Sequence, residues 1–184
     1  MTTISGDISK RSENQQKLLF EIIKRYDAYI GAANTKIAII LSYCMAYIGG
    51  IAFKIIDLIA KRDHNWTWWL PIVSAGISIA VTFYSAYRAY GALNPQMPSG
   101  RANHEKPSII FFGDVAGLNG GRDGYVHRIN EITDAEIVED LSRQAHVLAN
   151  IVSRKMALLN QSTQAIATIQ LPLSLLTILL LCII

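Results

Sequence analysis

Residues 165–184 read AIATIQLPLSLLTILLLCII, a stretch without a charged side chain. The hydrocarbon core of a bilayer is about 30 Å thick, and a helix rising about 1.5 Å per residue crosses it with about 20 apolar residues. A buried helix of a soluble protein is the alternative, but such helices rarely run so long without a charge. The stretch therefore predicts a transmembrane helix.

Two further apolar stretches precede it. Trp66–Tyr87 has the required length outright, and Ile37–Phe53 reaches it if Lys54 extends its amine toward the interface. The whole chain is 51% hydrophobic and 17% charged, whereas globular chains carry about 25% charged residues. We therefore predict an all-α (mainly) membrane protein with three transmembrane helices and a small helical cytosolic module.

Apolar and polar stretches divide the chain into six segments. We predict a cytosolic amphipathic helix (1–34), a first span (35–60), an outer loop (61–66), a second span (67–90), a cytosolic ligand-sensing module (91–163) and a third span (164–184).

Basic residues predict the topology. They gather before the first span and between the second and third, while the short loop between the first two spans holds only Lys61 and Arg62, beside Asp63. The positive-inside rule then places the N-terminus and the central module in the cytosol. An aromatic belt is expected at the outer boundary, from Trp66, Trp68 and Trp69.

The N-terminal segment predicts an amphipathic helix from Ser12 to Ala33. Ser12 and Gln15 have the form of a capping box, and apolar residues such as Leu18 and Ile22 recur at helical spacing. Acidic and basic residues are mixed on the other face, so packing against the central cytosolic segment is favoured over a membrane surface.

A second capping box, from Thr133 to Glu136, opens a long helix. Nothing breaks its pattern before the third span, so one helix is expected from about Asp134 through the membrane, bent at Pro172. Upstream, Leu93–Pro107 is predicted to be a linker. The short run Ser108–Phe112 fits either a buried extended segment or one turn of helix.

Glycines crowd the stretch from Gly113 to Gly124, which predicts a loop with positions free to take positive φ. Such a loop, which carries Arg122, could hold an anion on its backbone N–H groups, although a plain flexible loop is the favoured alternative. Lys36, at the start of the first span, fits either a boundary lysine or a ligand contact.

Known catalytic motifs are absent from the sequence. It has no serine-hydrolase elbow, no HExxH, no Walker A ending and no metal-binding spacing of Cys and His. Glu136, Glu139 and Asp140 open a helix, where carboxylates usually favour the dipole and remain solvated. Cys44 and Cys182 lie in apolar stretches and predict no disulfide. We expect no enzyme, no catalytic residue, no metal and no cofactor.

Two elements at the ends of the first two spans resemble the bacterial Pycsar transmembrane effector family. Residues 34–37 (Asn-Thr-Lys-Ile) stand where the family has Asp-x-Lys-Ala, and differ from it at Asn34 and Ile37. Phe-Phe-Gly-Asp, at 111–114, follows the second span with Tyr125 after it, and is the most specific piece.

The long helix carries a third element of the resemblance. From Asp140 through Gln144 to Lys155, a Gln, an Asn/Ser position and a Lys recur at helical spacing. Order, spacing and membrane placement agree with the family over roughly residues 15–184.

The resemblance implies an antiphage effector of the bacterial inner membrane. A partner cyclase would make a cyclic nucleotide on infection, either cyclic CMP, cyclic UMP or a cyclic dinucleotide. The cytosolic module would bind it, and homo-oligomers would then breach the bilayer, causing growth arrest or cell death. No nucleic-acid partner is expected. The candidate ligand contacts are Lys36, Phe112, Asp114, Arg122, Tyr125, Gln144 and Lys155.

Three alternatives stay open. Asp114 could be structural, capping the glycine turn. The chain could be a constitutive membrane scaffold that recruits a cytosolic protein. It could also be a small transporter or channel subunit, which would need polar residues facing each other at the midplane. The spans offer few beyond Thr168, Gln170, Ser174 and Thr177.

Overall fold

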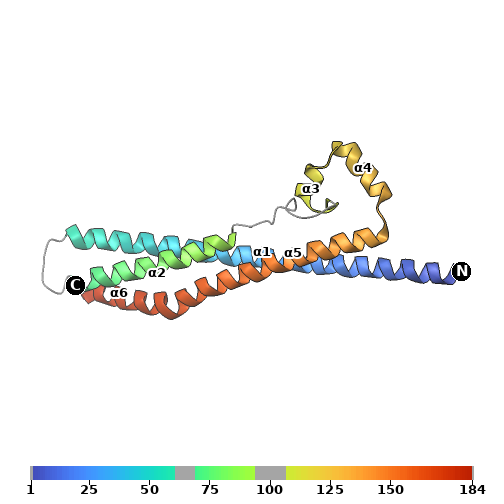
Figure 1. Ribbon diagram of the computed structural model, residues 1–184. Helices are drawn as coiled ribbons and strands as arrows, with labels where there is room; N and C mark the ends of the chain where they lie inside the picture. Colours follow the sequence, from blue (N-terminus) through green and yellow to red (C-terminus); the bar gives the residue numbers. More distant parts are fainter. Residues whose placement is uncertain (1, 61–68, 94–106, 184) are drawn as a thin grey trace. The chain divides into compact units, whose positions relative to one another are not determined.

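The computed structural model describes residues 2–60, 69–93 and 107–183 (Figure 1). Within these ranges every regular element is helical, which confirms the predicted fold class. The elements are α1 (Thr2–Ala60), α2 (Trp69–Leu93), α3 (Phe112–Ala116), α4 (Gly121–Glu131), α5 (Asp134–Ala165), the π-helical turn η3 (Ile166–Gln170) and α6 (Leu171–Ile183). The predicted outer loop, Trp66, Trp68 and nearly all of the predicted linker lie outside the described residues.

The chain divides into two compact units. Unit 1 comprises residues 1–30 and 95–153, and unit 2 comprises residues 31–94 and 154–184. Both α1 and α5 contribute residues to each unit. The two units are described separately below.

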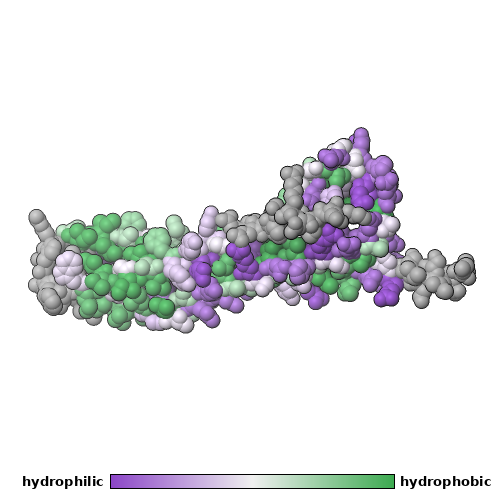
Figure 2. Space-filling view, in the orientation of Figure 1, coloured by the Kyte–Doolittle hydropathy of each residue, from purple (hydrophilic) through white to green (hydrophobic). Residues whose placement is uncertain are grey.

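Unit 2 has the surface of a membrane protein. Three of the described helices are long and apolar enough to cross a bilayer, within Lys10–Asp57, Trp69–Leu93 and Asp134–Cys182. Hydrophobic residues cover α2, α6 and the second half of α1 in Figure 2. Phe53, Phe83 and Leu175 are examples, each at least 59% exposed. A lipid environment accounts for this exposure, because a protein in water rarely exposes so large an apolar surface.

Several small residues of α2 are buried inside unit 2. Ser74, Ala75 and Ser78 are buried, and such residues let helix backbones approach closely in membranes. At Gly49 and Gly50, by contrast, an added Cβ would meet open space. Those two glycines therefore do not mark a helix contact within the described residues.

The predicted start of the N-terminal helix is wrong. α1 begins at Thr2, so Ser12 lies inside the helix and cannot cap its first turn. No proline occurs in the sequence before Pro71, and nothing else stops the helix in this part of the chain. The backbone consequently stays helical through Ala33 to Ala60.

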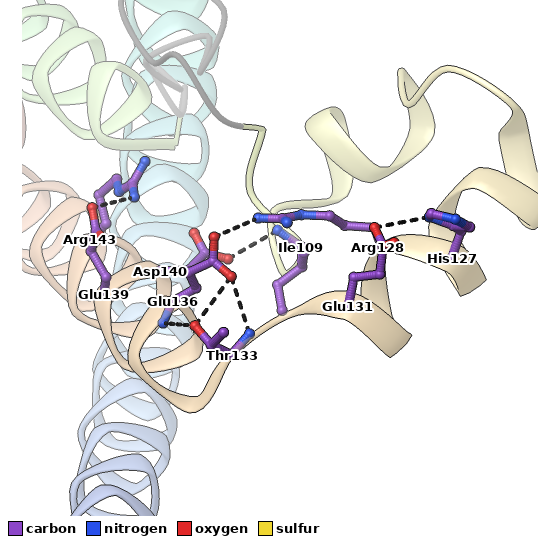
Figure 3. A network of polar contacts seen from close by, with 9 residues as sticks. All are labelled: Ile109, His127, Arg128, Glu131, Thr133, Glu136, Glu139, Asp140 and Arg143. Carbon is purple, nitrogen blue, oxygen red and sulfur yellow. Dashed lines mark hydrogen bonds and ion pairs between the residues drawn. The ribbon is translucent and has the colours of Figure 1, made fainter.

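The capping box at the start of α5 is confirmed. The N–H of Glu136 donates to Thr133 Oγ1 at 3.3 Å, and the N–H of Thr133 donates to Glu136 Oε2 at 3.1 Å (Figure 3). Each side chain thus satisfies the other residue's free backbone N–H.

The helical backbone runs without interruption from Asp134 to Ile183, as predicted, and its irregular turn lies just before Pro172. The chain changes direction at η3, between α5 and α6 (Figure 1). Pro172 has no N–H to donate to the carbonyl of Thr168, so a regular α-helical turn at this place would lack one hydrogen bond. A π-helical turn, Ile166–Gln170, accommodates the missing bond.

Candidate functional site

Ser108 is the centre of a hydrogen-bond network in unit 1. Its hydroxyl donates to Asp140 Oδ2 at 2.9 Å and accepts from the N–H groups of Ile110 and Phe111 at 3.1 and 3.0 Å. Its own N–H donates to Asp114 Oδ2 at 3.0 Å. Asp114 is therefore tied to the segment before α3 by a structural hydrogen bond.

Asp140 extends this network across to α5. It is 5% exposed, and its Oδ2 also accepts from the N–H of Ile109 at 3.0 Å (Figure 3). The expectation that this carboxylate would be solvated is wrong. Tyr125 donates its hydroxyl to the carbonyl of Ile109 at 2.9 Å, and Gln144 Nε2 donates to Ser108 Oγ at 3.3 Å. The structure thus brings Asp114, Tyr125 and Gln144 to one segment. Below, the Ser108 network means Ser108, Asp114, Tyr125, Asp140 and Gln144.

Most of the glycine-rich stretch is helical, contrary to the predicted loop. Gly113 lies in α3 and Gly124 in α4, and only 117–120 lies between these helices. The prediction of positive φ is confirmed at Gly120 (φ 85°) and Gly121 (φ 55°). Because L side chains avoid this region, the two glycines permit the tight reversal that α4 needs to start here.

An open pocket of about 440 Å³ lies beside the Ser108 network in unit 1. This volume falls within the range of small-molecule sites. Its lining includes two acidic side chains, two basic or titratable side chains and one side-chain amide. The lining residues are Pro107, Gly113, Asp114, Gly117, Leu118, Asn119, Gly124, His127, Arg128 and Glu131.

Carboxylates hold the basic side chains of this pocket. His127 Nδ1 lies 3.1 Å from Glu131 Oε2, and Arg128 Nη2 lies 3.5 Å from Glu136 Oε1 (Figure 3). The Arg128 contact is long for a charge-assisted hydrogen bond. Glu136 therefore holds Arg128 only weakly.

Phe112 and Arg122 do not belong to the Ser108 network. Phe112 is 64% exposed, and its ring centroid lies 4.9 Å from that of Phe111. Arg122 is exposed in the first turn of α4. Neither side chain lines the pocket, so Asp114 alone among the predicted contacts does.

The other two predicted contacts, Lys36 and Lys155, belong to unit 2. Lys36 is exposed on α1. Lys155 is 7% exposed, and its amine donates to the carbonyl of Ala92 at 2.6 Å and to Asn34 Oδ1 at 3.0 Å. Both acceptors are neutral, and they lie on different helices. Lys155 thus joins α1, α2 and α5.

Replacing Lys155 with methionine is expected to destabilise unit 2 by about 2 kcal/mol, because two acceptors lose a charged donor. The free energy of unfolding in mixed detergent micelles measures the change. Gln161→Met is the matched control, since Gln161 is exposed on the same helix. Equal stabilities of the two variants would contradict a joining role for Lys155.

The described residues contain no cluster of His, Cys, Asp and Glu side chains able to hold a metal ion. A family model described as the Pycsar effector protein domain matches residues 18–184. The match includes the Ser108 network, the pocket and Lys155. Comparisons with curated proteins and with solved structures give no match.

Proposed function

The chain belongs to the Pycsar effector family, and from that premise we propose that it is an antiphage membrane effector that binds a cyclic nucleotide through unit 1 and then impairs the inner membrane. The nucleotide would be cyclic CMP, cyclic UMP or a cyclic dinucleotide made by a partner cyclase. The proposal assigns no catalytic residue to the chain and keeps homo-oligomers as the active form.

The pocket beside the Ser108 network is the observation that carries this proposal. A cyclic nucleotide brings a phosphate, a ribose and a base into one compact ligand. His127 and Arg128 would contact the phosphate, and the Asn119 amide can both donate to and accept from the polar groups of the sugar or base. The volume of about 440 Å³ suits a small ligand.

The response to binding would begin at Asp114, which both lines the pocket and holds the N–H of Ser108. A ligand that takes this carboxylate as its own partner weakens the segment that Asp140 and Gln144 also hold. Such a ligand binds the two states of the segment with different affinity, which shifts their populations. We propose that α5, which holds Asp140 in unit 1 and Lys155 in unit 2, carries the change toward the membrane.

The remaining predicted contacts stay proposals with different roles. Tyr125 and Gln144 make structural bonds, so we propose them as positioning residues. Phe112 and Arg122 are exposed and free to contact a ligand base or phosphate. Lys36 and Lys155 stay proposed phosphate contacts, on the resemblance alone. The distribution of basic residues supports a cytosolic N-terminus and a cytosolic unit 1.

Purified full-length protein in liposomes is expected to release trapped small solutes with only one member of a panel of cyclic mono- and dinucleotides. Arg128→Gln should weaken the affinity for that nucleotide by about tenfold or more, because a charged hydrogen bond to phosphate is lost. Isothermal titration measures the affinity, and solute release measures the response.

Arg143→Gln is the matched control, since Arg143 pairs with Glu139 at 3.0 Å and does not line the pocket. Equal affinities of the two variants would rule out the pocket. Folded, inserted protein that binds no nucleotide and releases nothing would instead favour the membrane scaffold.

A further inference from the structure

Polar side chains from α1, α2, η3 and α6 meet inside unit 2. The hydroxyl of Tyr43 donates to Gln170 Oε1 at 2.6 Å, joining α1 to η3. The hydroxyls of Ser74 and Thr177, 2.6 Å apart, join α2 to α6. A third hydrogen bond, between the hydroxyls of Tyr47 and Ser78, joins α1 to α2. We call this set the polar seam; it consists of Tyr43, Tyr47, Ser74, Ser78, Gln170 and Thr177.

The seam lies inside a bundle whose outer surface is apolar. Ser78, Gln170 and Thr177 are each 0% exposed, while Ile77 and Ile178, their neighbours in sequence, are at least 50% exposed. Hydrocarbon offers no partners to polar groups, so such side chains turn inward in a membrane. The three hydrogen-bonded pairs of the seam therefore form a polar interior in an apolar unit.

Gln170 shows that the seam is not fully satisfied by the protein. Its Oε1 accepts from Tyr43, but its Nε2 is buried and has no hydrogen-bond partner among the described residues. Burying an amide donor without a partner is unfavourable, most of all in hydrocarbon. A leucine would carry no such donor, although the Tyr43 hydroxyl would lose its acceptor. An acceptor such as a water oxygen or an inorganic anion would satisfy this free donor.

An apolar cluster interrupts the polar interior toward Lys155. This collar consists of Ile37, Ala89, Ala92 and Leu159, each at most 5% exposed. Ile37 precedes Tyr43 along α1, and Ala89 and Ala92 follow Ser78 along α2, which runs in the opposite direction. The collar therefore lies at one end of the seam. The carbonyl of Ala92 also accepts from Lys155. Hydrophobic constrictions of this kind close membrane channels by excluding water.

We propose that the polar seam is the route by which water and small inorganic ions cross the membrane, and that the collar is its closed gate. The inference rests on the proposed function only in that nucleotide binding opens the gate. Hydroxyl and amide groups replace part of the hydration of a passing ion. Each protomer of the homo-oligomer would hold one such route, and three helices enclose only a narrow one, so large solutes are excluded.

The test uses the full chain in liposomes of phosphatidylethanolamine and phosphatidylglycerol, with potassium flux and release of a trapped dextran recorded together. Ala89→Ser places a hydroxyl in the collar and is expected to raise potassium flux about tenfold without nucleotide, because the hydroxyl lowers the penalty for water. Dextran stays trapped. Ile39→Ser is the matched control, because Ile39 is 64% exposed on the lipid side of α1, and it leaves the flux unchanged.

A second substitution separates the route from general loosening. Adding Gln170→Leu to Ala89→Ser removes the free amide donor from the seam. The potassium flux of this double variant should return close to that of the Ile39→Ser control. Flux from Ala89→Ser no higher than from Ile39→Ser, or dextran released together with potassium, would overturn the inference. If Ala89→Ser conducts while no cyclic nucleotide activates the unsubstituted chain, the inference stands and the proposed function fails.

Discussion

In Asp140→Ala, the protection of the amide hydrogens of residues 108–111 from exchange is expected to fall at least about a hundredfold, because about 3 kcal/mol of local stability is lost. The substitution leaves the Ile109 N–H and the Ser108 hydroxyl without their acceptor in a buried place. Hydrogen exchange followed by mass spectrometry measures the effect on this segment directly. Nucleotide-dependent release from liposomes should disappear with it.

Glu139→Ala is the control for this prediction. Glu139 directly precedes Asp140, but its side chain is 72% exposed and pairs with Arg143, so its loss should change exchange by less than about threefold. Asp140→Asn, which keeps one acceptor oxygen, should fall between the two. Equal protection in Asp140→Ala and Glu139→Ala would show that the buried carboxylate does not hold the segment.

Gly124→Ala is expected to unfold the turn between α3 and α4, because the substitution destabilises it by about 3 kcal/mol or more. A Cβ at this position would lie 2.2 Å from the carbonyl oxygen of Asn119, and backbone cannot move aside as a flexible side chain can. Since both residues line the pocket, nucleotide affinity should be lost as well. Thermal unfolding followed by circular dichroism and isothermal titration measure the two effects.

Gly121→Ala provides a graded comparison. Gly121 has φ 55°, which is strained for alanine, but a Cβ there would meet open space. Its cost should be about 1 kcal/mol, so the variant keeps the turn and most of the affinity. The steric account would be refuted by a Gly124→Ala variant no less stable than Gly121→Ala.

The sequence predicted those features that local patterns decide. Long charge-free stretches predicted the membrane helices, because lipid imposes both length and composition on a span. The capping box at Thr133 and Glu136 was predicted because its two bonds are made within four consecutive residues. The irregular turn before Pro172 follows from one missing N–H.

Features that depend on distant partners could not be predicted in this way. Asp140 has the composition of a solvated helix start, and only the segment at Ser108, far away in sequence, makes it a buried acceptor. The polar seam was underestimated for the same reason. Gln170 and Thr177 were visible in the sequence, but their partners Tyr43 and Ser74 resembled ordinary interfacial or small residues of other spans.

The predicted start of the first helix failed for a different reason. Ser12 and Gln15 fit a capping pattern, yet a pattern of two residues does not end the helix that already surrounds it. Similarly, the glycines after Phe112 suggested a loop, whereas Gly113 and Gly124 are needed where a neighbouring ring or carbonyl leaves no room for a side chain. At these positions glycine is needed because there is no room for a side chain, and not only because the backbone must be free to bend.

The π-helical turn at Ile166–Gln170 gives the following helix a choice of angular register. A π turn holds about one residue more than an α turn, and one residue corresponds to a rotation of about 100° around the helix axis. If the turn became regular, α6 would therefore rotate as a rod. Ser174 and Thr177, both buried in the described state, would sweep toward lipid, and the apolar side of α6 would replace them. A single turn of backbone can thus exchange the two faces of a membrane span without unwinding it.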